Sequence, residues 1–143
     1  MRRRVWASLL ILTALLHVNC GGMPSMGGAT DILTGLLTNQ LGVTSNQAVG
    51  GVGSILSLAK ERLSSMDFSA LTKLIPGADT YMKSARDLGA VTGPIKDQAG
   101  LTSAFSRLGM GSDMVPKFTQ ILSDFVGKAG GQPASNLVKQ AVQ

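Results

Sequence analysis

The residue with the most specific chemistry in this sequence is Cys20, the only cysteine of the chain. Before it come Arg2, Arg3 and Arg4 and then an apolar run of 14 residues, Val5 to Val18. A basic start followed by a run shorter than the roughly 20 residues of a spanning helix is typical of a bacterial export signal. A lone thiol in an exported protein has no internal disulfide partner, and lipidation explains its presence. We therefore predict that residues 1–20 are a signal peptide ending at a lipobox cysteine.

Two residues before Cys20 depart from the usual lipoprotein pattern and leave alternatives open. His17 and Asn19 stand where leucine and a small residue are common. Ordinary cleavage near residues 20–22 would leave a soluble periplasmic protein, and an uncleaved signal would itself be an anchor. In the lipoprotein interpretation, residues 21–29 are a flexible, glycine-rich tether that holds the following domain at a membrane surface.

The rest of the chain lacks the groups that common catalytic and metal sites use. The only histidine, His17, lies in the predicted signal, and Glu61 is the only glutamate. Their scarcity excludes Ser-His and Cys-His nucleophile systems and most zinc sites after the signal. We therefore expect no enzyme, no catalytic, metal-binding or cofactor-binding residues, and no cofactor.

The net charge of +5 depends largely on the signal. Without Arg2, Arg3 and Arg4, 10 basic residues remain against 8 acidic ones, so the charge falls to +2. The remaining lysines are scattered singly, and aromatic residues make up only 4% of the chain. Nucleic acid is therefore not an expected partner. The expected partners are the membrane, through the lipid anchor, and an envelope protein that the sequence does not identify.

Residues 30–143 are predicted to form one all-α domain, a compact bundle of about six short helices. Apolar residues recur at spacings of three and four, and no stretch alternates as a strand does. Helices are expected over about 30–41, 44–63, 67–75, 79–88, 102–108 and 113–128, and Pro133 is expected to open a last one.

Local residue types predict which residues cap two of these helices and which side chains form an ion pair on one of them. Thr44 and Gln47 have the spacing of a capping box. Ser112 is expected to cap the helix over 113–128, and Asp124 and Lys128 are expected to pair at four-residue spacing on its exposed face.

Gly50, Gly51 and Gly53 are unusual because they fall inside a predicted helix, where each costs about 1 kcal/mol relative to alanine. We favour a close helix crossing, which would make Gly51→Val destabilising by about 1–3 kcal/mol. Insertion into a membrane is the alternative, but the glycine-rich apolar run from Ala48 to Ala59 has only 12 residues before Lys60. A phosphate-binding loop is poorly supported, because GGVG lacks the Gly-Lys-Ser/Thr ending.

The segment from Asn39 to Asp79 reads NQLGVTSNQAVGGVGSILSLAKERLSSMDFSALTKLIPGAD. It resembles a bacterial family of unknown function labelled VcgC/VcgE. The resemblance continues through FSRLG at Phe105–Gly109, the pair Met114-Val115 and the amphipathic helix that follows. It implies a small all-helical domain, often behind an export signal. It implies no activity and supplies no catalytic residues.

These features predict an exported cell-envelope protein, lipid-anchored or otherwise periplasmic, that is a non-enzymatic binding or interaction module. One alternative is a membrane-active protein, pore-forming or toxin-like, because its glycine-rich apolar helices carry few charges. Another is a binder of a small apolar ligand between helices. Its candidate residues are Met66, Met82, Met110 and Met114, although filling of the core is a common use of methionine.

Overall fold

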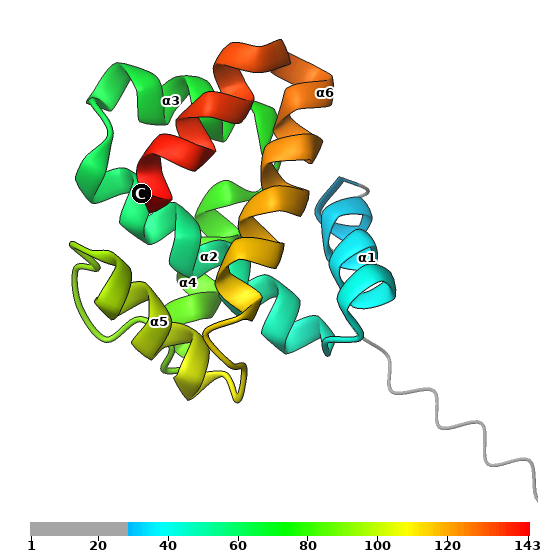
Figure 1. The fold of residues 1–143 in the computed structure, drawn as a ribbon, viewed down its shortest axis with the longest axis vertical. Helices are drawn as coiled ribbons and strands as arrows, with labels where there is room; N and C mark the ends of the chain where they lie inside the picture. The colour runs from blue at the N-terminus through cyan, green and yellow to red at the C-terminus, as the bar shows by residue number, and fades with distance from the viewer. Residues whose placement is uncertain (1–28) are drawn as a thin grey trace, which may run out of the picture.

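The computed structural model describes residues 29–143, which form six α-helices (Figure 1). They are α1 (Ala29–Leu41), α2 (Ser45–Arg62), α3 (Ser65–Leu74), α4 (Ala78–Asp87), α5 (Gln98–Arg107) and α6 (Met114–Val142). The described part of the chain contains no strand, and the prediction of an all-α bundle is confirmed.

The central element is α2, which contacts each of the other five helices. Every residue from Gly50 to Ala59 is buried, because this stretch carries no charge and is covered on all sides. The charged residue Lys60 follows at the exposed end. None of the helices within residues 29–143 combines the length and apolarity needed to cross a membrane.

The turn between α1 and α2 follows from its residue types. Gly42 has a φ of 66°, a left-handed conformation in which a glycine commonly ends a helix. The Thr44 hydroxyl then accepts a hydrogen bond from Gln47 N at 3.2 Å, and Gln47 Oε1 accepts one from Thr44 N at 3.0 Å. The predicted capping box is therefore present.

The three glycines of α2 lie where neighbouring helices cross it, as predicted. A Cβ atom on Gly51 would come within 2.5 Å of the Phe118 ring in α6. On Gly50 it would come within 2.7 Å of the Leu108 side chain, and on Gly53 it would collide with the backbone carbonyl of Tyr81 in α4. The absence of side chains is what allows α4 and α6 to approach α2 this closely.

Helix α1 is held against the bundle by apolar packing and by one tyrosine. Leu33 and Leu37 are buried. The Tyr81 hydroxyl donates to Thr30 O at 2.8 Å and lies 3.3 Å from Thr34 Oγ1. A fully buried tyrosine therefore has its polar end satisfied while its ring fills the core.

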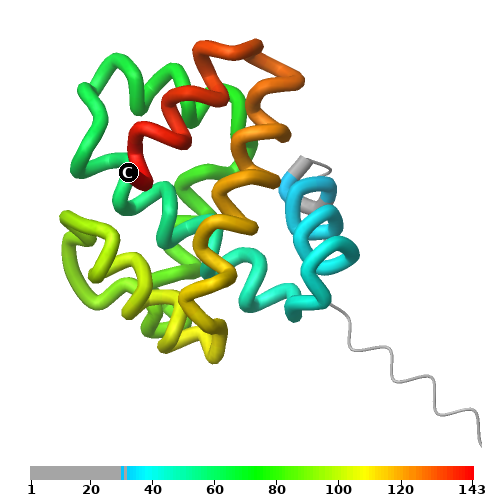
Figure 2. Tube along the Cα trace, in the orientation of Figure 1, coloured from blue at the N-terminus to red at the C-terminus, as the bar shows by residue number. Residues whose placement is uncertain are grey.

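Helix α6 consists of two arms that fold back on each other, as the trace in Figure 2 shows. The first arm spans residues 114–130 and the second spans 132–142. Gly131 joins them with φ 71° and ψ −168°, values outside the helical region. Pro133 lies at the start of the second arm, close to the predicted helix start.

Three local predictions are wrong. Ser112 does not cap α6; the N-cap is Asp113, whose side chain makes no capping bond. The four-residue ion pair of the first arm joins Asp113 to Lys117, and none joins Asp124 to Lys128. Helix α5 begins at Gln98 and not near residue 102, because Asp97 Oδ1 accepts a hydrogen bond from Gly100 N at 2.8 Å. That cap extends the helix to include Gly100, which lies outside the predicted helix over 102–108.

Candidate functional site

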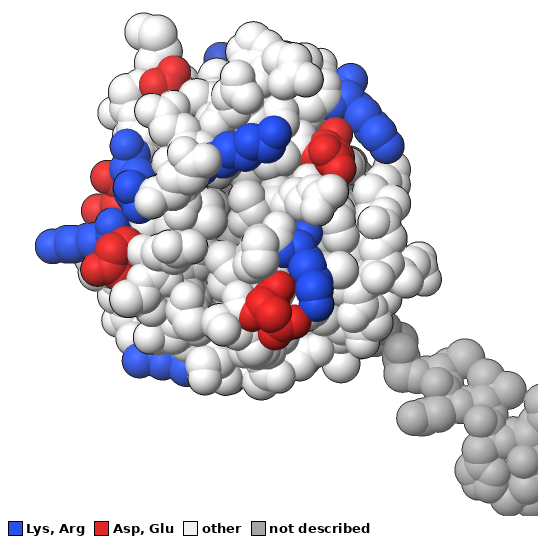
Figure 3. All heavy atoms as spheres, viewed as in Figure 1, with Lys and Arg blue, Asp and Glu red and all other residues white. Residues whose placement is uncertain are grey.

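The one site residue predicted from the sequence, Cys20, lies outside the described residues. Its lipidation therefore stays a prediction. Within residues 29–143, no three His, Cys, Asp or Glu side chains lie together in a way that could hold a metal ion. On the face shown in Figure 3, basic and acidic side chains are scattered among uncharged ones, and neither sign gathers into a patch.

The two arms of α6 and the start of α5 enclose a surface groove of about 680 Å³, which we call the α6 groove. Its apolar lining comes from Val115, Pro116 and Val142. Its polar lining comprises Gln98, Thr119, Gln120, Ser123, Asp124, Lys139 and Gln143. The groove thus offers three side-chain amides, two hydroxyls, the carboxylate of Asp124 and the ammonium group of Lys139 around an apolar strip.

Ser123 is the unusual residue of the α6 groove. It is fully buried, and its Oγ is the only buried side-chain N or O atom in the described residues without a hydrogen-bond partner. One turn earlier, Thr119 Oγ1 donates to Val115 O at 2.8 Å, and in α2 Ser54 Oγ donates to Gly50 O at 2.8 Å. Ser123 makes no such bond to its own helix. Buried polar groups are normally paired, so this unpaired hydroxyl is an exception among the side chains that line the groove.

The α6 groove continues toward the kink as a shallower depression. Ser123 and Asp124 line both, and Gly127, Gly131 and Ser135 line the extension. A Cβ on Gly127 would lie 3.4 Å from Ser135 Cβ, so small residues set the close spacing of the arms here. The geometry of the groove therefore depends on how the two arms pack.

We expect Ser123→Ala to raise the free energy of unfolding by about 1 kcal/mol, because it removes a buried hydroxyl that is not hydrogen bonded. Urea denaturation of the isolated protein measures the change. Ser54→Ala is the matched control, because that hydroxyl is bonded and its loss should give no gain. A destabilised Ser123→Ala protein would contradict the expectation and would mean that the hydroxyl has a partner in solution.

A second surface feature lies between α1 and the first arm of α6, and we call it the α1–α6 groove. Its volume is about 530 Å³. It is lined by the apolar residues Ile32, Leu36, Ile121 and Phe125, with Ala129, and by Gln40, Asp124 and Lys128. Ile32 is 59% exposed, which is unusual for a large aliphatic side chain on a helix that packs against a core. The methionines of the ligand hypothesis are elsewhere: Met82 and Met110 are buried in the core, and Met66 is 82% exposed on α3.

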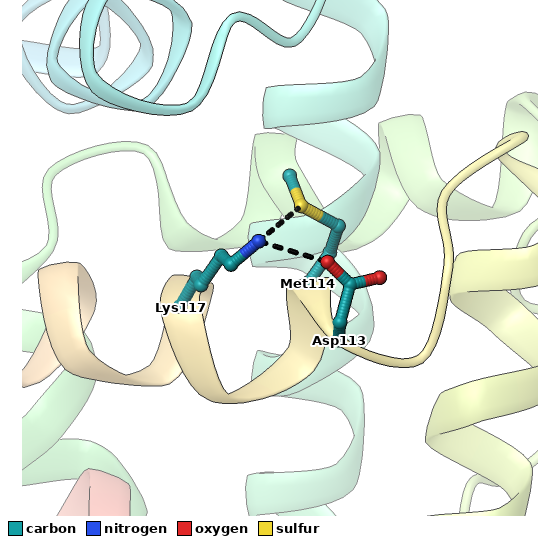
Figure 4. Close-up of polar contacts among 3 residues, drawn as sticks. All are labelled: Asp113, Met114 and Lys117. Atoms are coloured by element: carbon teal, nitrogen blue, oxygen red, sulfur yellow. Dashed lines mark hydrogen bonds and ion pairs between the residues drawn. The ribbon is translucent and has the colours of Figure 1, made fainter.

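At the start of α6, the carboxylate of Asp113 is paired with a lysine one turn further along the helix. Lys117 Nζ lies 2.8 Å from Asp113 Oδ2 and 3.9 Å from Met114 Sδ (Figure 4). The hydrogen bond and the positive charge of Lys117 hold the pKa of Asp113 below its ordinary value of 3.8. Because both groups are exposed, this pair orders a helix end and adds little to the global stability.

A depressed pKa stabilises the folded state above the pKa of the unfolded chain, and the contribution is lost as the pH falls through the folded pKa. The contribution of Asp113 should therefore be complete at neutral pH, should begin to fall as the pH drops below 3.8, and should be lost only below the lower pKa of the folded state. In Lys117→Gln, the Asp113 pKa should move up toward 3.8, as an NMR titration of the carboxyl group would show. An unchanged pKa in that variant would contradict this origin of the shift.

The family model described as "Protein of unknown function VcgC/VcgE (DUF2780)" matches residues 21–143. The chain belongs to this family. No curated protein and no solved structure matches it.

Membership of the VcgC/VcgE family confirms the resemblance inferred from residues 39–79 and from FSRLG. The matched range includes all six helices of the described structure. The description of the VcgC/VcgE family states no activity, so the chemistry of the α6 groove has to be argued from its own residues. Sequence reasoning missed Ser123 and Lys139, because nothing in their local sequence signals that two arms of one kinked helix bring them to the same groove.

Proposed function

We propose that this protein is exported to the cell envelope, is held on a membrane by a lipid on Cys20, and works by binding a partner protein. The export part rests on the arginines, the apolar run and the lone cysteine of the first 20 residues. The binding part rests on the α6 groove. A non-enzymatic role is supported by the composition of the chain, which has no histidine after His17.

The observation that carries the binding role is the Ser123 hydroxyl, buried and unpaired in the lining of the α6 groove. The groove volume of about 680 Å³ falls within the roughly 300–1,000 Å³ typical of ligand sites. The side-chain amides of Gln98, Gln120 and Gln143 both donate and accept hydrogen bonds, as peptide groups do. The backbone of an extended segment of an envelope protein would form hydrogen bonds with these amides. The side chains of that segment would pack against the apolar strip.

A photo-crosslinking experiment in intact cells tests this proposal. A photoreactive amino acid at Gln120, an exposed residue of the groove, should form one adduct with an envelope protein. Asn46 is the matched control, because it is also exposed but lies at the start of α2, outside the groove. The adduct at Gln120 should disappear when Lys139→Glu reverses the only positive charge of the groove.

Two results would contradict the binding role. One is the same adduct from Asn46, which would mean chance proximity in a crowded envelope. The other is an adduct from Gln120 that persists in the Lys139→Glu variant, provided that the variant keeps its thermal midpoint. A preserved midpoint is expected because Lys139 is exposed and its replacement leaves the core unchanged.

A further inference from the structure

The α1–α6 groove leaves apolar side chains uncovered at one place on the surface. Ile32 is 59% exposed, and Leu36, Ile121 and Phe125 are only partly buried. Helix α1 and the second arm of α6 lie on opposite sides of the first arm (Figure 1), and the residues that line the groove belong to α1 and the first arm. It is therefore separate from the α6 groove, although Asp124 borders both.

The position of Ile32 along the chain indicates what covers this groove. Nine residue steps separate Cys20 from Ala29. Whatever their conformation, these residues span at most about 30 Å. The radius of gyration of a domain of this size is about 13 Å. A chain anchored at Cys20 therefore keeps the start of α1 close to the bilayer, and Ile32 lies about 4.5 Å further along the axis of that helix.

We infer that the membrane carrying the lipid anchor is the surface against which the α1–α6 groove rests. The inference builds on the proposed lipidation of Cys20. Within residues 29–143, three large hydrophobic side chains are exposed, and Ile32 is the one next to the anchor; Met66 lies on α3 and Leu88 at the end of α4. The charges that border the groove are one of each sign, Asp124 and Lys128, so an anionic lipid surface is not repelled.

A contact made by a few partly buried side chains is weak by itself. Tethering raises the local concentration of the membrane surface to the millimolar range, where a weak contact becomes populated. The protein should therefore touch the bilayer through Ile32 when it is anchored and should not bind vesicles when it is not. The α6 groove would then face away from α1 and remain open to a protein partner.

The experiment uses the chain from residue 20 onward, which contains every described helix. Its only thiol, Cys20, is coupled to a maleimide lipid in vesicles of phosphatidylethanolamine and phosphatidylglycerol. Trp6, the only tryptophan of the chain, is absent from this form, so Ile32→Trp introduces a single fluorophore. Met66→Trp is the control, because Met66 is 82% exposed on α3, which lies on the other side of the molecule from α1 (Figure 1).

The emission of Ile32→Trp should shift to shorter wavelength on coupling and should be quenched severalfold by lipids with brominated acyl chains. The emission of Met66→Trp should change little, and neither protein should respond when its thiol is blocked. Adding Phe125→Ser should reduce the response of Ile32→Trp. Because the maleimide lipid replaces the natural anchor, a failure here is distinguishable from absent lipidation in cells, which is measured separately on Cys20.

Two outcomes would overturn the inference. In the first, Ile32→Trp keeps a water-like emission on coupled vesicles, or responds no more than Met66→Trp does. In the second, its emission shifts without vesicles as the protein concentration rises and the mass doubles. That result would mean that a second copy of the chain covers the groove.

Discussion

Gly53→Ala is expected to lower the free energy of unfolding by about 3 kcal/mol or more, at the upper end of the range for overpacked cores. The added methyl group would collide with the backbone carbonyl of Tyr81 and would lie 2.8 Å from Ala85 Cβ. A backbone carbonyl cannot rotate away as a side chain can. The substitution can therefore be accommodated only if α2 and α4 move apart, which disturbs the most extensive helix contact of the bundle.

Gly35→Ala is the matched control for Gly53→Ala. Gly35 also lies inside a helix, α1, but no atom comes within 4 Å of a Cβ placed on it. The higher helix propensity of alanine should stabilise this variant by about 0.5–1 kcal/mol. Urea denaturation of both proteins tests the pair. If both substitutions changed the free energy of unfolding equally, helix propensity alone would explain the effect at Gly53. That result would contradict a close crossing of α2 and α4 at this residue.

Phe118→Ala is expected to lower the free energy of unfolding by about 3–5 kcal/mol. Phe118 is fully buried, and its ring meets that of Phe105 edge to face, with centroids 5.1 Å apart. Truncation would remove this ring contact and leave a cavity against Gly51 of α2. Phe68→Ala, at a half-buried position in α3, should cost clearly less. Thermal and urea unfolding would measure both variants, and similar losses would contradict a central role for Phe118.

The contact between Gly51 and Phe118 can be tested directly by combining two substitutions. Gly51→Val alone should destabilise the protein by about 1–3 kcal/mol through overpacking. In the Phe118→Ala background the added side chain would enter the cavity, so its cost should be much smaller. Residues in contact show such non-additivity, whereas distant ones do not. Additive effects in this cycle would contradict the contact.

The sequence was most informative where one residue type determines a local conformation. Thr44 and Gln47 predict a capping box because both hydrogen bonds close within one turn. The glycines of α2 predict a crossing because each destabilises an isolated helix and needs a compensating contact. The sequence cannot say which helix crosses at each glycine, since the contacts with Tyr81, Phe118 and Leu108 join distant segments.

Predictions failed where two nearby residues compete for one role. Ser112 and Asp113 are both good N-cap residues, and Asp113 occupies the N-cap position while its carboxylate pairs with Lys117. Helix α5 starts earlier than predicted, because the Asp97 carboxylate accepts a hydrogen bond from Gly100 N. The α6 groove was not predicted because it depends on the direction of the second arm, which Gly131 sets through a single backbone conformation.

Lipidation of Cys20 decides whether one side of the protein faces a membrane. The roles proposed for the α6 groove and the α1–α6 groove both depend on it. The most direct measurement is the intact mass and the N-terminal peptide of the protein purified from the membrane fraction of its native cells. We expect an N-terminal peptide that begins at Cys20 and carries the mass of two or three acyl chains. A free N-terminus beyond Cys20 on a protein in the soluble periplasm would contradict it.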